Sequence, residues 1–168
     1  MSLGLHFALK RDESERLLAI GDPDELVDFI TEELEERYLS GDHKWVYQSD
    51  KAWDAIHRCL TDGQLLYESG PFPLAYAVLG GQALDAGDDY TACLVQPAHL
   101  SELRDALRQV SREALLQRYQ KLSDTDYAKY QELSDADFEY TWSHFDGLRE
   151  FFDVVAGSER FVLFTTDC

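Results

Sequence analysis

Four stretches of the chain carry the hydrophobic pattern of β-strands. In residues 3–10 every second position is apolar, which predicts a strand with one buried face. Residues 44–48 and 90–95 combine aromatic with β-branched side chains, the types that strands favour. Residues 160–166 are nearly all apolar, which is typical of a strand at the buried centre of a sheet.

Helical patterns fill most of the sequence between these strands. A first helix is predicted to begin at Asp12. The letters DPDE, starting at Asp22, predict a second helix with an aspartate cap, a proline in the first turn and a glutamate that completes a capping box. Its apolar residues share one face as far as Leu39. Ser49 is expected to cap a third helix over residues 50–61.

The second half of the chain continues the same alternation of helices and strands. Pro97 begins a helical pattern that Ser111 caps anew, and Ser134 opens a last helix with a long apolar stripe. Residues 123–135 are the least patterned and predict a loop or an irregular helix. Helices between strands predict one domain over residues 1–168, of the α+β or mixed α/β class. We expect about four strands in a mixed sheet, and the sequence does not determine their order.

Charge limits the partners that the protein can bind. The 168 residues include 33 acidic and 15 basic side chains, for a net charge of −18. Such a surface repels nucleic acid and anionic membranes and attracts basic partners. The first residues hold no apolar run long enough for a signal peptide, and no stretch has the length of a membrane span. Cys59, Cys93 and Cys168 form no CxxC pair, so we expect reduced thiols and a cytoplasmic protein.

The segment from residue 49 to 63 contains reactive side chains that could suggest an active site. On a helix, Cys59 falls on the apolar face, while His57, two positions away, points well apart from it. A Cys–His nucleophile pair within this segment is therefore excluded. Asp54 and Arg58 are four residues apart, which predicts an ion pair on the solvent side.

The same segment carries a family resemblance. Its letters are DKAWDAIHRCLTDG, followed by PLAYAVLGG, and around them stand ESERLLAIGDPDELVDFI, QPAHLSELRDAL and FDGLREFFDVVAGSERFVLF. In these motifs the chain resembles the YfbM-like family of small, uncharacterised bacterial proteins over nearly its whole length; the tract from about Ser111 to Ser134 matches least. The resemblance implies a compact bacterial cytoplasmic α+β domain. It implies no known reaction, so it assigns no catalytic residue.

The sequence leaves one candidate site for a small ligand or an enzymatic reaction. Trp53 and His57 lie one turn apart at the border of a buried helix face, and Gly80 and Gly81 could let the backbone approach a ligand. An ordinary core histidine and an ordinary glycine turn are the competing interpretations. The five histidines lack metal-ligand spacing, and no cofactor motif is present, so we expect neither a metal nor a cofactor.

Four carboxylates in the second predicted helix form a second candidate site. Asp24, Asp28, Glu32 and Glu36 recur every four residues and stack on one face, and we call them the acidic ridge. Like charges at this spacing destabilise a helix by a few tenths of a kcal/mol per pair. One interpretation is a merely solvated face. The other is a docking face for a basic protein partner, as in an inhibitor or immunity-type protein, and this is the function that we favour over the enzyme or small-ligand alternative.

Overall fold

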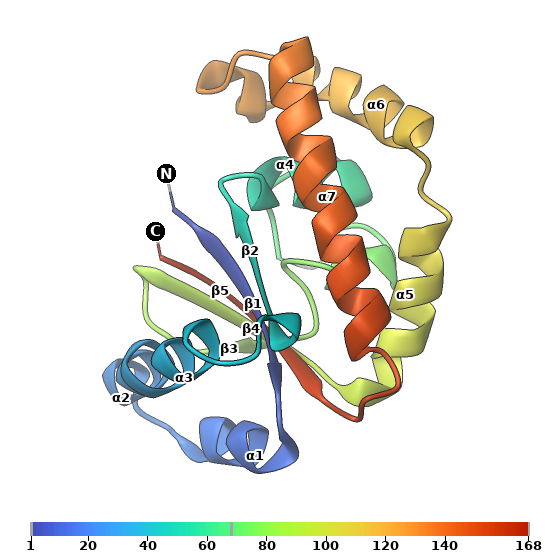
Figure 1. Ribbon diagram of the computed structural model, residues 1–168. Helices are drawn as coiled ribbons and strands as arrows, with labels where there is room; N and C mark the ends of the chain where they lie inside the picture. Colours follow the sequence, from blue (N-terminus) through green and yellow to red (C-terminus); the bar gives the residue numbers. More distant parts are fainter. Residues whose placement is uncertain (1, 68, 168) are drawn as a thin grey trace.

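The computed structural model describes residues 2–67 and 69–167. In these residues a five-stranded sheet has the order β2-β1-β5-β4-β3, and each neighbouring pair is antiparallel (Figure 1). The strands are β1 (Gly4–Leu9), β2 (Val46–Asp50), β3 (Gln82–Leu84), β4 (Tyr90–Val95) and β5 (Phe161–Asp167). The first and last strands pair at the centre, so the two ends of the chain lie side by side.

The α+β class is confirmed, and the five observed strands are close to the expected number of about four. The expected mixed sheet is wrong, because each neighbouring pair of strands is antiparallel. The fifth strand, β3, is a three-residue edge strand paired with β4, too short to show a hydrophobic period. Neighbouring strands such as β1 and β2, or β4 and β5, run in opposite directions, so the helical segments that connect them return to the same end of the sheet. The length of a helical segment alone does not determine strand direction.

Helices cover both faces of the sheet (Figure 1). One face packs against α1 (Arg11–Ala19), α2 (Pro23–Asp28), the π-helix η1 (Phe29–Leu34) and α3 (Glu35–Leu39). The other packs against α4 (Trp53–Leu60), α5 (Leu100–Arg108), α6 (Arg112–Gln120) and α7 (Asp135–Val155). Short 3-10 helices are η2 (His43–Trp45), η3 (Leu74–Tyr76), η4 (Pro97–His99), η5 (Lys121–Asp124) and η6 (Asp126–Lys129).

The helix α2–η1–α3 is continuous and begins as the sequence predicts. The Asp22 side chain accepts a hydrogen bond from the backbone N–H of Glu25 at 3.0 Å. Its middle turn is π-helical, and the N–H of Glu35 donates to the carbonyl of Ile30, five residues back. The predicted cap of the first helix is wrong. Lys10 occupies the N-cap of α1, and its N–H donates to the side chain of Glu13 at 2.9 Å.

Helix α4 is buried on every side. Its apolar face is confirmed, with Cys59 1% exposed. Ser49 does not cap it: Ser49 lies in β2, buried, and its hydroxyl donates to the carbonyl of Gly4 at 3.3 Å. The prediction of a solvent-facing Asp54–Arg58 pair is also wrong. The pair forms, at 2.6 Å, but η6 covers it and places Asp126 2.6 Å from the same guanidinium.

Candidate functional site

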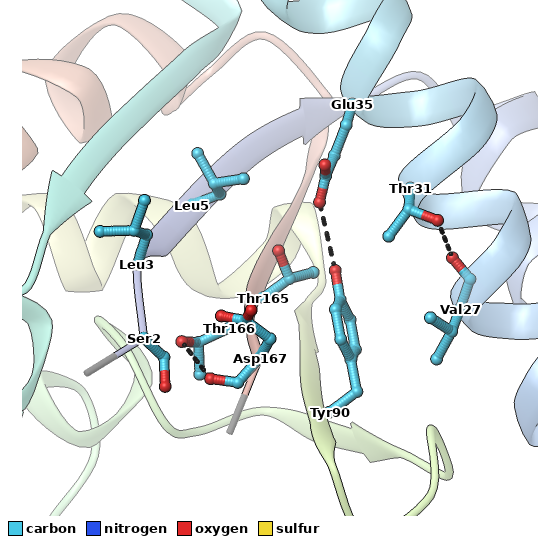
Figure 2. A pocket seen from close by; sticks show the side chains of 10 residues that line it. All are labelled: Ser2, Leu3, Leu5, Val27, Thr31, Glu35, Tyr90, Thr165, Thr166 and Asp167. Carbon is cyan, nitrogen blue, oxygen red and sulfur yellow. Dashed lines mark hydrogen bonds between the residues drawn. The ribbon is translucent and has the colours of Figure 1, made fainter.

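A pocket of about 670 Å³ opens between the helix α2–η1–α3 and the ends of three strands (Figure 2). The helix contributes one wall, β4 contributes an aromatic side, and β1 and β5 contribute the floor and rim. Ten residues line the pocket: Ser2, Leu3, Leu5, Val27, Thr31, Glu35, Tyr90, Thr165, Thr166 and Asp167. None of these lining residues is a lysine, arginine or histidine.

The π-helical turn aligns three side chains of the helix in a row that faces the pocket. Val27, Thr31 and Glu35 follow one another at intervals of four residues. In an α-helix such a row drifts around the axis by about 40° per step. The π-helix is wider and turns less per residue, so it reduces the drift across these positions. The Thr31 hydroxyl donates to the Val27 carbonyl at 2.9 Å, which fixes the middle of the row.

Glu35 and Tyr90 meet inside the pocket. The Tyr90 hydroxyl donates to Glu35 Oε1 at 3.3 Å (Figure 2). Burial raises the pKa of Glu35, the hydrogen bond from Tyr90 lowers it, and the charge of Asp167 raises it. Burial also raises the pKa of Tyr90, which keeps the phenol protonated as a donor. A half-buried carboxylate held in place by a phenol can accept hydrogen bonds from a ligand or transfer a proton.

Hydroxyl groups and a second carboxylate complete the polar side of the pocket. Thr165 and Thr166 are 1% and 2% exposed, and Asp167 follows them at the exposed rim. The Thr166 hydroxyl donates to the Asp167 carbonyl at 3.3 Å. Leu3 and Leu5 supply apolar surface beside them. The pocket thus offers mainly hydrogen-bond acceptors next to an apolar wall.

Sequence reasoning missed this pocket because its residues come from four segments far apart in the chain. The one local signal lies on the helix itself. Thr31 and Glu35 are polar positions on the row that starts at Val27, between the apolar stripe and the acidic ridge. Polar residues beside an apolar stripe are ordinary on a surface helix, so this signal does not distinguish a pocket from solvent.

His57, a candidate residue from the sequence, is buried by the loop that follows α4. Its Nε2 lies 2.8 Å from the Leu66 carbonyl and 3.1 Å from the Ser69 hydroxyl. Burial lowers the pKa of His57, and the hydrogen bond to the Leu66 carbonyl opposes this effect. The imidazole therefore holds the loop against α4.

Trp53 lies at another pocket, of about 350 Å³. Trp53 lines it together with Tyr67 and Cys93. The Tyr67 hydroxyl donates to the carbonyl of Gly81, but neither Gly80 nor Gly81 belongs to the lining. His57 is not part of its lining. Of the four candidate residues, only Trp53 lines this pocket, and the imidazole of His57 lies behind the loop.

The two glycines permit close backbone packing. A Cβ added to Gly80 would lie 2.2 Å from the Ala75 carbonyl oxygen, and one added to Gly81 would lie 2.6 Å from the Leu94 carbonyl oxygen. Gly81 also has a φ of +91°, a conformation that favours glycine. Both glycines thus have a packing role that is independent of any ligand.

The four side chains of the acidic ridge are all exposed. Within residues 2–67 and 69–167, no arginine, lysine or histidine lies within ion-pair distance of them. Neighbouring carboxylates differ. Glu33 accepts two hydrogen bonds from Arg16, at 2.7 and 2.9 Å, and Glu13 accepts one from Arg37 at 2.5 Å. The nearby arginines are therefore engaged by other acids.

Residues 2–67 and 69–167 contain neither a cluster of metal-ligating side chains nor a membrane-spanning helix. No group of three or more histidine, cysteine, aspartate or glutamate side chains is placed to hold a metal ion. The helices in residues 2–67 and 69–167 are also too short or too polar to cross a bilayer.

Comparison with known proteins assigns a family. The fold is similar to that of the crystal structure of YfbM from Escherichia coli, a protein of unknown function, with a TM-score of 0.72 and 19% sequence identity. The similarity covers 98% of this chain and 99% of that one. No curated protein matches the chain. The model of the DUF1877 family, a domain of unknown function, matches residues 1–165. The YfbM-like resemblance is thus confirmed, and the chain belongs to the DUF1877 family.

Proposed function

We propose that the protein is a binding protein whose acidic ridge docks a basic protein partner, as an inhibitor or immunity-type protein would. One observation carries the proposal. Asp24, Asp28, Glu32 and Glu36 are exposed and, among the described residues, have no cationic partner, while the arginines around them pair with other carboxylates. The buried thiols of Cys59 and Cys93 suit the cytoplasm, where we place the protein.

The charges of this helix destabilise the free protein and favour the binding of a basic partner. The helix region from Asp22 to Arg37 carries eight carboxylates and one arginine. Like charges one turn apart destabilise the helix. A basic partner would relieve this repulsion, and the net charge of −18 would speed its approach. The π-helical turn keeps the ridge compact, because it reduces the drift of residues four apart.

The test compares two variants of equal charge. The ridge variant carries Asp28→Lys and Glu32→Lys. The control variant carries Glu102→Lys and Glu132→Lys, two exposed carboxylates in the half of the chain that covers the other sheet face, neither in an ion pair among the described residues. Each variant and the parent are used to capture proteins from native cell extract at low and high salt. We expect a basic protein that parent and control retain at low salt and the ridge variant loses. Equal capture by all three would contradict the proposal.

A second candidate function rests on the pocket at Trp53. Its volume of about 350 Å³ and its lining by Trp53, Leu79 and Cys93 suit a small apolar ligand or substrate. The test uses indole as a probe and Ala83→Trp, which fills the pocket from its wall. Indole should raise the melting temperature of the parent and leave that of Ala83→Trp unchanged. An equal shift in both proteins, or none in the parent, would remove this candidate.

A further inference from the structure

The pocket between the helix α2–η1–α3 and the sheet carries an inference that is independent of the acidic ridge. None of the four ridge carboxylates belongs to its lining. Its volume of about 670 Å³ lies within the range of roughly 300–1,000 Å³ typical of small-molecule sites. The polar groups converge from the helix, β4 and β5, so the site is assembled by the fold (Figure 2).

The charged side chains of the lining determine which ligand charge the pocket can accept. Glu35 and Asp167 bring carboxylates, and the lining has no basic side chain to balance them. An anion would be repelled, and a neutral ligand would leave the half-buried carboxylate of Glu35 without a charge partner. A cationic N–H donor would satisfy Glu35 with a charge-assisted hydrogen bond, the strong kind.

The arrangement also selects the shape of the ligand. Tyr90 donates to one oxygen of the Glu35 carboxylate, Oε1, which fixes the direction of that group. The hydroxyls of Thr31 and Thr165 lie in the same lining, and Leu3 and Leu5 present apolar surface opposite the helix. A ligand that fits has a charged nitrogen at Glu35 and a hydrocarbon portion along the leucines.

We propose that this pocket binds a small organic cation, an amine or guanidine on a partly apolar body, with Glu35 as its charge partner. Tyr90 is a positioning residue, because it holds the carboxylate through its hydroxyl. The site neither requires nor excludes a protein partner at the acidic ridge, so failure of either proposal leaves the other standing.

The test uses agmatine, a guanidine on an aliphatic amine chain, and 1,4-butanediol, a neutral chain with four carbons. Binding is followed by titration calorimetry at about 0.15 M salt, where long-range attraction to the acidic surface is screened. Glu35→Gln is compared with Glu36→Gln, which removes the same charge from the next residue, on the acidic ridge and outside the pocket. We expect agmatine to saturate one site, Glu35→Gln to weaken its binding about tenfold or more, and Glu36→Gln to change it less than about twofold. Butanediol should not bind.

Three outcomes would overturn the proposal: no saturable agmatine binding, equal weakening in both variants, or binding of butanediol as strong as that of agmatine. Equal weakening would mean that the cation only follows the net charge. Backbone amide chemical shifts of the parent give a test that does not depend on the folding of a variant. Agmatine should shift Thr31, Glu35 and Thr165, and shifts confined to residues outside the lining would contradict the site.

Discussion

Arg58 donates to Asp54 across a 2.6 Å ion pair in which both side chains are buried, with 0% and 6% of their surfaces exposed. Three further groups complete the guanidinium's shell: the Gly63 carbonyl at 3.2 Å, the Asp126 carboxylate at 2.6 Å and the Tyr130 hydroxyl at 3.1 Å. The bonds to Asp126 and Tyr130 hold η6 and the residue that follows it against α4.

Removal of one partner from this pair should destabilise the protein strongly. Asp54→Ala leaves a buried guanidinium short of one charge, and we expect a loss of about 3–5 kcal/mol in the free energy of unfolding. Asp126→Ala serves as the comparison, because its carboxylate is 55% exposed and water can replace it. Urea denaturation should show the smaller loss for Asp126→Ala. Equal losses of unfolding free energy would contradict the view that Asp54 is the more important charge partner of Arg58.

Trp53 should contribute as much stability as a core aromatic residue. It is 8% exposed, its ring lies 5.7 Å from that of Phe164, and its indole N–H donates to the Ser2 carbonyl at 3.0 Å. We expect Trp53→Ala to cost about 3–5 kcal/mol. Gly4→Ala should also destabilise the protein, since its Cβ would lie 2.6 Å from the Ser49 hydroxyl oxygen and 2.9 Å from the indole. A Trp53→Ala protein that melts like the parent would show that the ring does not pack as described.

Cys59 should resist thiol reagents in the folded protein. Burial raises the pKa of its thiol to about 12, so little thiolate forms at neutral pH. Native labelling followed by peptide mass analysis should find Cys59 and Cys93 unmodified until denaturant is added. Cys168 lies outside the described residues, so the prediction concerns Cys59 and Cys93 alone. Cys59→Ser places a hydroxyl in an apolar site and should cost about 1–3 kcal/mol. Rapid native labelling of Cys59 would refute its place in the core.

His6 should make the protein less stable in acid. Burial lowers the pKa of His6 to about 4, against the smaller opposing effect of the hydrogen bond with the Ala77 carbonyl. The Nδ1 atom of the ring has no partner among the described residues. Because the unfolded chain binds the proton near pH 6.5 and the folded chain near pH 4, the stability from neutral His6 is complete above pH 6.5 and is lost as pH falls to about 4. The loss amounts to about 3 kcal/mol.

Substitution isolates this contribution from those of the other titrating groups. His6→Gln cannot take up the proton, so its unfolding free energy should fall less than that of the parent between pH 6.5 and 4. The exposed His43 provides the matched control, because His43→Gln makes the same substitution outside the core. An unchanged slope in His6→Gln would mean that the buried imidazole does not resist protonation.

Local chemistry was the part of the fold that the sequence predicted well. Ser111 and Ser134 cap α6 and α7, because a cap needs only its own hydroxyl and an N–H three residues on. Ser49 failed for a non-local reason, since its hydroxyl bonds to Gly4 on the neighbouring strand. Asp54 and Arg58 pair as their spacing predicts, yet their burial depends on η6, whose sequence shows no clear period.

The candidate site was predictable only in part. The acidic ridge could be read from spacing alone, and its four side chains share one exposed helix face. Glu35 and Tyr90 stand 55 positions apart and meet because the helix α2–η1–α3 packs on a sheet face to which β4 contributes. Antiparallel strand order arises from contacts between distant segments, which a single sequence does not reveal. The pocket that these residues form therefore required the structure.

Charge reversal on the acidic ridge should leave the fold intact. Asp28→Lys and Glu32→Lys remove repulsion with Asp24 and Glu36 and create pairs of opposite sign at the same spacing. Because no ion pair of the described residues involves these carboxylates, we expect equal or higher stability, by a few tenths of a kcal/mol per pair at low salt. Urea denaturation checks this. A large loss of stability would show that the carboxylates have partners that hold the fold together.

The association rate of the captured basic partner, measured against salt concentration, tests the proposed function most directly. Parent and control variant should bind rapidly at low salt and slow down steeply as salt increases, because attraction to the acidic ridge steers the encounter. The ridge variant should bind more slowly and with a flatter salt dependence, although it is as stable as the parent. If the partner instead binds the ridge variant with the same rate and the same salt dependence as the parent, the acidic ridge is not its docking surface.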